Sequence, residues 1–224
     1  MDVQLDKKLT SPTTRPAWLA AQTPERLIVG YWVIASVIGI PILWDWLSAW
    51  NVGATLAMPW LVGYLVFSFV LSQILYLLVA RHGGRPIHWG AVAIFAVGNG
   101  LAETFAFAAI YRVGEVIGAG MMGLFAPAGA SLAGFILGVI FFSIYGGLIH
   151  ALFWMKVLPP HLDESPRSRM IRKWRPMAEV ALVLSWSLCL WLTRDIWTVI
   201  FFHTLVDIGL MLIVRPAIFG AKEQ

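Results

Sequence analysis

Four ionisable side chains lie inside strongly apolar stretches of this sequence. His203 and Asp207 stand four residues apart, and Glu103 and His150 each interrupt another apolar run. Residues four apart on a helix share one face, so His203 and Asp207 should point the same way. A charge at membrane depth costs about 2.5–3.5 kcal/mol on insertion scales and usually marks a site or an internal pair. We therefore expect Glu103, His150, His203 and Asp207 to line one cavity.

Three kinds of chemistry fit these residue types. A glutamate can take a proton from water as a general base, while histidines hold an oxyanion or a leaving group. Two histidines with two carboxylates can instead bind a divalent metal whose water is the nucleophile. As a third alternative, His150 and His203 could ligate haem iron or chlorin magnesium without catalysis.

Each residue also has a purely structural explanation. His150 could donate to a backbone carbonyl, and Asp207 could exist only to satisfy His203. Asn99 stands four residues before Glu103 and could form a pair with it that fixes the register of neighbouring helices. Because buried polar groups need partners, and these side chains can supply one another, a shared internal site is the more economical interpretation.

The composition restricts the class of protein. The chain of 224 residues is 59% hydrophobic and 12% charged, and its mean hydropathy is +0.78. Soluble domains are about one quarter charged, so these values predict an all-α integral membrane protein surrounded by lipids. The net charge of +4 comes from basic residues in the loops. These are not clustered as nucleic-acid binding would require, so we expect no nucleic-acid partner.

The apolar runs predict one bundle of about six transmembrane helices over residues 27–215, between a polar tail at 1–26 and a second tail at 216–224. The first tail lacks the pattern of a cleavable signal, so we expect the first span to be retained. Pro41 predicts a kink and Asp195 an N-cap. The expected spans are residues 27–47, 53–80, 87–111, 141–158, 177–192 and 195–214.

The charges predict the orientation. With both termini on one side, that side receives 14 of the 16 Lys and Arg residues. This imbalance favours a multi-pass protein with both ends cytoplasmic. The tryptophans fit aromatic belts at two interfaces. We assign to the outer belt Trp44, Trp46, Trp50, Trp60, Trp191 and Trp197, and to the inner belt Trp89, Trp154 and Trp174.

A glycine-rich segment separates the third and fourth expected spans. Residues 114–138 hold seven glycines, including two pairs spaced four apart. Small residues are common where transmembrane helices touch. We favour close packing and a flexible outer connection over a re-entrant gating element.

The order of these motifs, over residues 95–214, resembles the family of CAAX-prenyl proteases and bacteriocin-processing enzymes. That family is identified by the motifs E-E-x-x-x-R, F-x-x-x-H and H-x-x-x-N or H-x-x-x-D. The third matches as His203-x-x-x-Asp207, and the second keeps His150 but has Gly146 in place of phenylalanine. In the first, which would begin at Glu103, Thr104 replaces the second glutamate and Ala108 the arginine. Arg112, nine residues after Glu103, is too far along the helix to take the arginine's place.

The resemblance implies a glutamic-type intramembrane peptidase that needs no cofactor and cleaves a transmembrane or membrane-associated protein. Glu103 would activate water, His150 and His203 would support it, and Asp207 would orient His203 or help hold an oxyanion. The altered first motif equally implies a family member that has lost catalysis and binds a membrane partner or an assembly. A haem- or pigment-binding subunit remains the third alternative.

Overall fold

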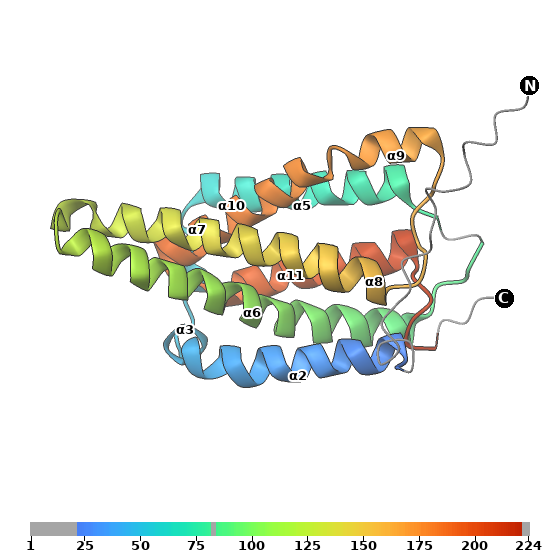
Figure 1. Cartoon of the computed structure of the whole chain (residues 1–224), viewed down its shortest axis with the longest axis horizontal. Coiled ribbons are helices and arrows are strands. Elements are labelled where there is room, and N and C mark those ends of the chain that lie inside the picture. The colour runs from blue at the N-terminus through green and yellow to red at the C-terminus, as the bar shows by residue number, and fades with distance from the viewer. Residues whose placement is uncertain (1–21, 82–83, 221–224) are drawn as a thin grey trace, which may run out of the picture.

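The computed structural model of the chain describes residues 22–81 and 84–220, in which the fold is all-α (Figure 1). No strand occurs among these residues, apart from one isolated bridge between Ala80 and Leu162. Six helical stretches are long and apolar enough to cross a membrane. The chain is therefore a polytopic membrane protein, as the sequence predicts. Of the expected tails at 1–26 and 216–224, residues 1–21 and 221–224 lie outside the described residues.

The helices follow one another with short connections. In chain order they are α2 (Pro24–Ile42), α3 (Trp44–Ser48), α4 (Val52–Leu56), α5 (Pro59–Val79), α6 (Trp89–Gly123), a 3-10 turn (Pro127–Gly129), α7 (Ala130–Ile149), a π-helical segment (His150–Trp154), α8 (Met155–Val157), α9 (Pro166–Arg172), α10 (Arg175–Thr193), α11 (Ile196–Gly209) and a second π-helical segment (Leu210–Val214).

Local sequence explains several helix ends. Asp195 caps α11, as expected, because its side chain accepts a hydrogen bond from the Thr198 amide at 3.1 Å. Ser165 caps α9 in the same way, and a proline follows it at the first helical position. Arg194 takes a left-handed conformation with φ of 56° and ends α10. α2 ends at Ile42, one residue after Pro41, where the sequence predicts a kink.

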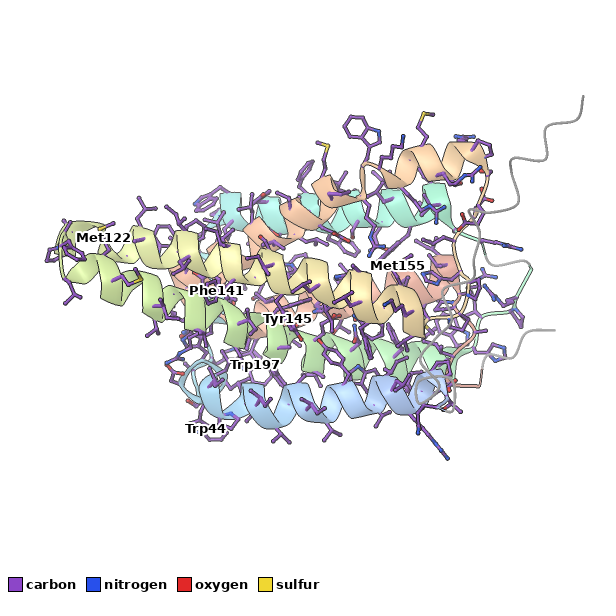
Figure 2. All side chains as sticks on the ribbon, in the orientation of Figure 1. Trp44, Met122, Phe141, Tyr145, Met155 and Trp197 are labelled. Carbon is purple, nitrogen blue, oxygen red and sulfur yellow. The ribbon has the colours of Figure 1, made fainter. Side chains whose placement is uncertain are left out.

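The third span is much longer than the expected 87–111. α6 has 35 residues, which corresponds to about 52 Å, whereas the hydrocarbon core of a bilayer is about 30 Å thick. The predicted start of the fourth span is also wrong, because α7 begins at Ala130 rather than near residue 141. Residues 114–138 are thus mostly helix, and α6 and α7 form a hairpin that extends past the other helices (Figure 1). Figure 2 shows Met122 at its tip and Met155 towards the opposite end.

Close packing explains the glycines of this hairpin. A Cβ atom on Gly114 would lie 2.7 Å from the Leu137 carbonyl oxygen, and one on Gly134 would lie 2.8 Å from that of Glu115. Real Cβ contacts are longer, so the two helices approach this closely only where no side chain intervenes. The predicted packing role is confirmed, and the segment contains no re-entrant turn.

A charged cluster lies where α3 and the α10–α11 turn meet the side of the hairpin. Arg112 pairs with Asp45, and Arg194 pairs with Glu115. Both guanidinium groups lie over the Trp46 ring, 5.1 and 5.2 Å from its centroid. Trp46 is only 4% exposed, so its ring is packed inside the protein. The Arg112 side chain holds the pKa of the Asp45 carboxyl below its usual value by hydrogen bonding.

The described chain begins and ends at the same end of the bundle. The start of α2, the second π-helical segment, α8 and α9 all lie there, opposite the hairpin tip (Figure 1). α6 is the most buried of the six spans and packs against α2, α7 and α11. It therefore provides the central wall on which the candidate site is built.

Candidate functional site

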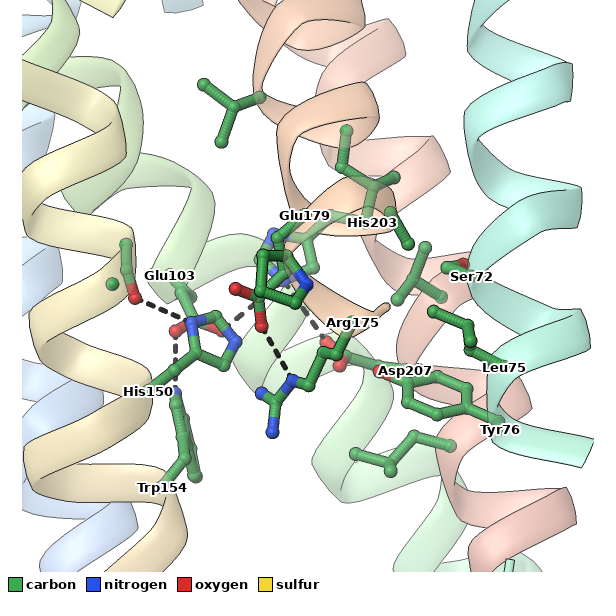
Figure 3. Close-up of a pocket in the computed structure, with 18 of the residues that line it drawn as sticks. Ser72, Leu75, Tyr76, Glu103, His150, Trp154, Arg175, Glu179, His203 and Asp207 are labelled. Carbon is green, nitrogen blue, oxygen red and sulfur yellow. Dashed lines mark hydrogen bonds and ion pairs between the residues drawn. The ribbon is translucent and has the colours of Figure 1, made fainter. Parts of the chain in front are cut away.

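A cavity of about 250 Å³ lies between α5, α6, α7, α10 and α11. All four sequence-predicted residues line it: Glu103, His150, His203 and Asp207. Figure 3 shows these side chains converging from three helices. The prediction that they share one cavity is confirmed in the structure. Glu103, His203 and Asp207 are buried, and His150 is half-buried.

Glu103 accepts from three donors on three helices. Its Oε1 accepts a hydrogen bond from Trp154 Nε1 at 2.7 Å, and its Oε2 accepts one from Asn99 Nδ2 at 2.8 Å. Nε2 of His203 lies 3.3 Å from Oε2. A carboxylate offers about four lone-pair sites, so the carboxylate is held firmly and about one site is left for a water molecule.

His203 is fixed through both ring nitrogens. Besides Glu103, its Nε2 faces Asp207 Oδ2 at 3.7 Å, and two carboxylates on one side require the proton to be on Nε2. Its Nδ1 lies 2.9 Å from the Thr104 hydroxyl. That hydroxyl can donate to a neutral ring or accept from a protonated one. Trp186 packs against the ring, with the centroids 4.8 Å apart.

Asn99 joins the two carboxylates. Its amide nitrogen donates to Glu103 and also to Asp207 Oδ2 at 3.0 Å, while its oxygen accepts from Trp32 Nε1 at 3.0 Å. The expected pair of Asn99 and Glu103 is present, and the amide also links α6 to α11. Asp207 makes its hydrogen bond to this amide, and its contact with His203 is longer than a hydrogen bond.

His150 is the least restrained of the four residues. Its Nδ1 donates to the Gly146 carbonyl at 2.7 Å, so a neutral ring presents a lone pair at Nε2. Among the described residues no hydrogen bond or ion pair to that nitrogen is found. His150 begins the π-helical segment, which ends at Trp154. A π turn is wider than an α turn, and this places His150 and Trp154 together on the cavity wall. Such segments are frequent at functional sites.

Three residues of this network were missed by sequence reasoning. Trp154 was assigned to the inner belt, but it is 5% exposed and donates to Glu103. Its position four residues after His150 was the available signal. Thr104 was treated only as a lost glutamate, yet it contacts His203. Trp32, on α2, carries no signal in the sequence that links it to the site.

The same geometry bears on the cofactor alternatives. Ligation by His150 and His203 together would require His203 to release one of its present contacts, because both of its ring nitrogens face other side chains. Within residues 22–81 and 84–220, no group of three or more His, Cys, Asp and Glu side chains has the arrangement of a metal site.

The cavity continues towards α9, where its wall carries charged residues. Arg172 forms a bidentate pair with Glu164 at 2.7 and 3.0 Å, and Arg175 Nε donates to Glu179 at 2.6 Å. The loop before α9 is fixed by Asp163, which accepts from the hydroxyls of Ser165 and Ser168. The Ser165 and Ser168 hydrogen bonds lower the pKa of Asp163 to about 2.

No protein-family model, no curated protein and no solved structure matches this chain.

Proposed function

We propose that this protein is a glutamic-type intramembrane peptidase of the kind found among CAAX-prenyl proteases and bacteriocin-processing enzymes. The observation that carries the proposal is the Glu103 carboxylate, held 3.3 Å from His203 in a cavity that also contains His150. Peptide hydrolysis needs a general base, a group that positions this base and a donor to the oxyanion. Glu103, His203 and His150 can supply these three functions in that order.

In the proposed reaction, a water molecule bound to Glu103 transfers a proton to the carboxylate. The resulting hydroxide attacks the carbonyl carbon of the scissile peptide bond. His150, which takes a proton from solvent at Nε2, donates to the oxyanion. When the C–N bond breaks, Glu103 passes its proton to the leaving amine nitrogen. His203 keeps the carboxylate in position, and Asp207 and Thr104 keep the ring of His203 in position.

The substrate class follows from the openings of the cavity. Exposed residues of α7 and α10 belong to its wall, namely Ser143, Gly147 and Val180. Because these exposed residues lie on membrane-spanning helices, a segment embedded in the membrane would reach the cavity between α7 and α10. The proposed substrate is therefore a transmembrane or membrane-associated protein.

A specific observation favours a second candidate, a non-catalytic relative that binds a membrane partner. Both oxygens of Glu103 already accept hydrogen bonds, and neither Thr104 nor Ala108 is ionisable. A network that is satisfied in this way can simply hold α2, α6 and α11 together.

The orientation in the membrane is part of the proposal. The charge imbalance in the sequence favours an orientation with the α9 end in the cytoplasm, and the hairpin tip would then lie on the outer side. The cavity would open near the cytoplasmic interface.

Glu103→Gln tests the two candidates. The variant keeps the size of the side chain but removes its basicity, so a peptidase should lose at least about 10²-fold in turnover. Cleavage of a membrane-embedded peptide library by purified protein is the direct assay, and complementation of a null strain is the cellular one. Asp207→Asn is the control, because the amide can still contact the imidazole and should cost less. Wild-type complementation by Glu103→Gln would exclude the peptidase and favour the binding protein.

A further inference from the structure

Arg175 lines the cavity near α9 and has donors to spare. Its Nε is engaged by Glu179, but Nη1 meets only the Met155 sulfur at 3.5 Å, and no carboxylate of the described residues contacts the terminal nitrogens. Figure 3 shows these nitrogens on the side of the guanidinium that faces away from Glu179. Two parallel N–H groups of this kind match the two oxygens of a carboxylate or a phosphate.

The surroundings of Arg175 favour an anion at the membrane surface. Three exposed cations nearby, Arg167, Arg169 and Lys173, form no ion pair within the described chain. Met170, between Arg169 and Lys173 in sequence, and Trp174, directly after Lys173, are 60% and 61% exposed. Exposed tryptophan beside basic residues is typical of the headgroup layer of a membrane, where anionic groups are held by Lys and Arg.

Much of the cavity wall is apolar. It includes Leu182 and Val183 of α10, Leu75 and Val79 of α5, and Phe142 of α7. The same space is open to lipid beside Val180, which is 53% exposed. A hydrocarbon chain could therefore enter from the bilayer while its head stays at the level of Arg175.

From these observations we infer that the cavity binds an anionic single-chain amphiphile, with an oxyanion head on Arg175 and a hydrocarbon chain along α5, α7 and α10. The ligand class is a long-chain carboxylate or the phosphate monoester of a lipid. This is a binding activity and requires no peptide cleavage. It holds whether the protein is a peptidase or a partner-binding relative.

Oleate binding to the full-length protein in a neutral detergent tests the inference, with displacement of a fluorescent fatty acid as the readout. We expect oleate to bind and uncharged oleyl alcohol to bind at least about tenfold more weakly, because only the carboxylate offers the guanidinium a negative charge and two acceptor oxygens. Acetate and inorganic phosphate, which have the head without the chain, should not displace the probe at millimolar concentration. Equal binding of oleate and oleyl alcohol, or displacement by phosphate alone, would overturn the inference.

Variants locate the site. Arg175→Gln should lower the affinity for oleate by about tenfold. Glu179→Gln should raise this affinity, because the guanidinium then loses its competing carboxylate. Lys156→Gln is the matched control, since it removes an exposed cation near the same end that does not line the cavity. Val183→Trp should block the space for the hydrocarbon chain and so lower the affinity for oleate. Unchanged affinity in both Arg175→Gln and Glu179→Gln would refute the assignment.

Discussion

The Thr104 hydroxyl lies 2.9 Å from Nδ1 of His203 and joins α6 to α11 directly beside the Glu103 carboxylate. In the resembling family a second glutamate stands at this position. Here a small, uncharged group at the same point contacts the histidine, and the imidazole remains restrained on both sides.

Replacing this hydroxyl should loosen His203. Thr104→Val keeps the shape of the side chain but leaves a buried ring nitrogen without its partner, which costs about 1–3 kcal/mol. Thermal unfolding in detergent measures the loss. Thr104→Ser should recover most of the stability and any peptidase turnover. Equal stability of the Val and Ser variants would show that the contact contributes nothing.

Glu103→Gln should also destabilise the fold. Its amide has one acceptor oxygen and one donor nitrogen, so the nitrogen must face either Trp154 Nε1 or the two donors at Oε2. A buried donor facing another donor costs about 1–3 kcal/mol. The measurement is again thermal unfolding. The double variant Glu103→Gln/Trp154→Phe should lose less stability than the sum of the losses in the two single variants. Strict additivity would contradict the proposed contact.

Gly100 permits the close approach of α6 and α11 at the site. A Cβ atom there would lie 2.9 Å from Thr204 Cα, so Gly100→Ala should separate the helices at a cost of about 1–3 kcal/mol. On the same helix, a Cβ atom added to Gly120 would have no neighbouring atom within 4 Å. Gly120→Ala is the matched control and should be neutral or slightly stabilising. Equal effects of the two substitutions would argue against the packing explanation.

The orientation can be tested by labelling with a membrane-impermeant thiol reagent. Phe125→Cys, at an 86% exposed hairpin position, should react from outside intact cells, whereas Arg169→Cys should react only in inverted vesicles. Native Cys189 is buried, so the wild type is the unlabelled control. Reaction of both positions from one side would refute the proposed topology.

The loop before α9 should respond to acid in one direction. The pKa of Asp163 is lowered to about 2, compared with about 3.9 in model peptides. Its ionised form therefore stabilises the loop fully above about pH 3.9, and this contribution is lost as the pH falls through about 2. Hydrogen exchange over residues 163–172 should increase only at that acidity, and Asp163→Asn should show the increase already at neutral pH. Similar protection in the variant at neutral pH would count against this.

Sequence reasoning identified the part of the site that depends on polarity and spacing. Glu103, His150, His203 and Asp207 stand out because ionisable groups are rare in apolar spans, and the i, i+4 spacing places two of them on one face. Trp154 did not stand out, because tryptophan is equally at home at an interface, and only tertiary packing decides which role it takes.

The boundaries of the third and fourth spans were predicted wrongly for a related reason. Residues 116–138 are uncharged and rich in glycine, a composition that is compatible both with an outer loop and with two tightly packed helices. The hydropathy pattern also gives no indication of the π-helical segment at His150–Trp154, whose extra width depends on contacts with other helices. Six spans could be counted from the sequence, but the depth of each side chain could not.

The α6–α7 hairpin also sets the order in which the site is assembled during synthesis. Glu103 lies on α6, and its donor Trp154 ends the π-helical segment that follows α7, so both emerge from the ribosome well before His203. The acidic group can therefore acquire its tryptophan donor while the last span is still untranslated. In a newly made chain that stops before α11, the Glu103 carboxylate would already have the Trp154 donor. His203 would then join the site last.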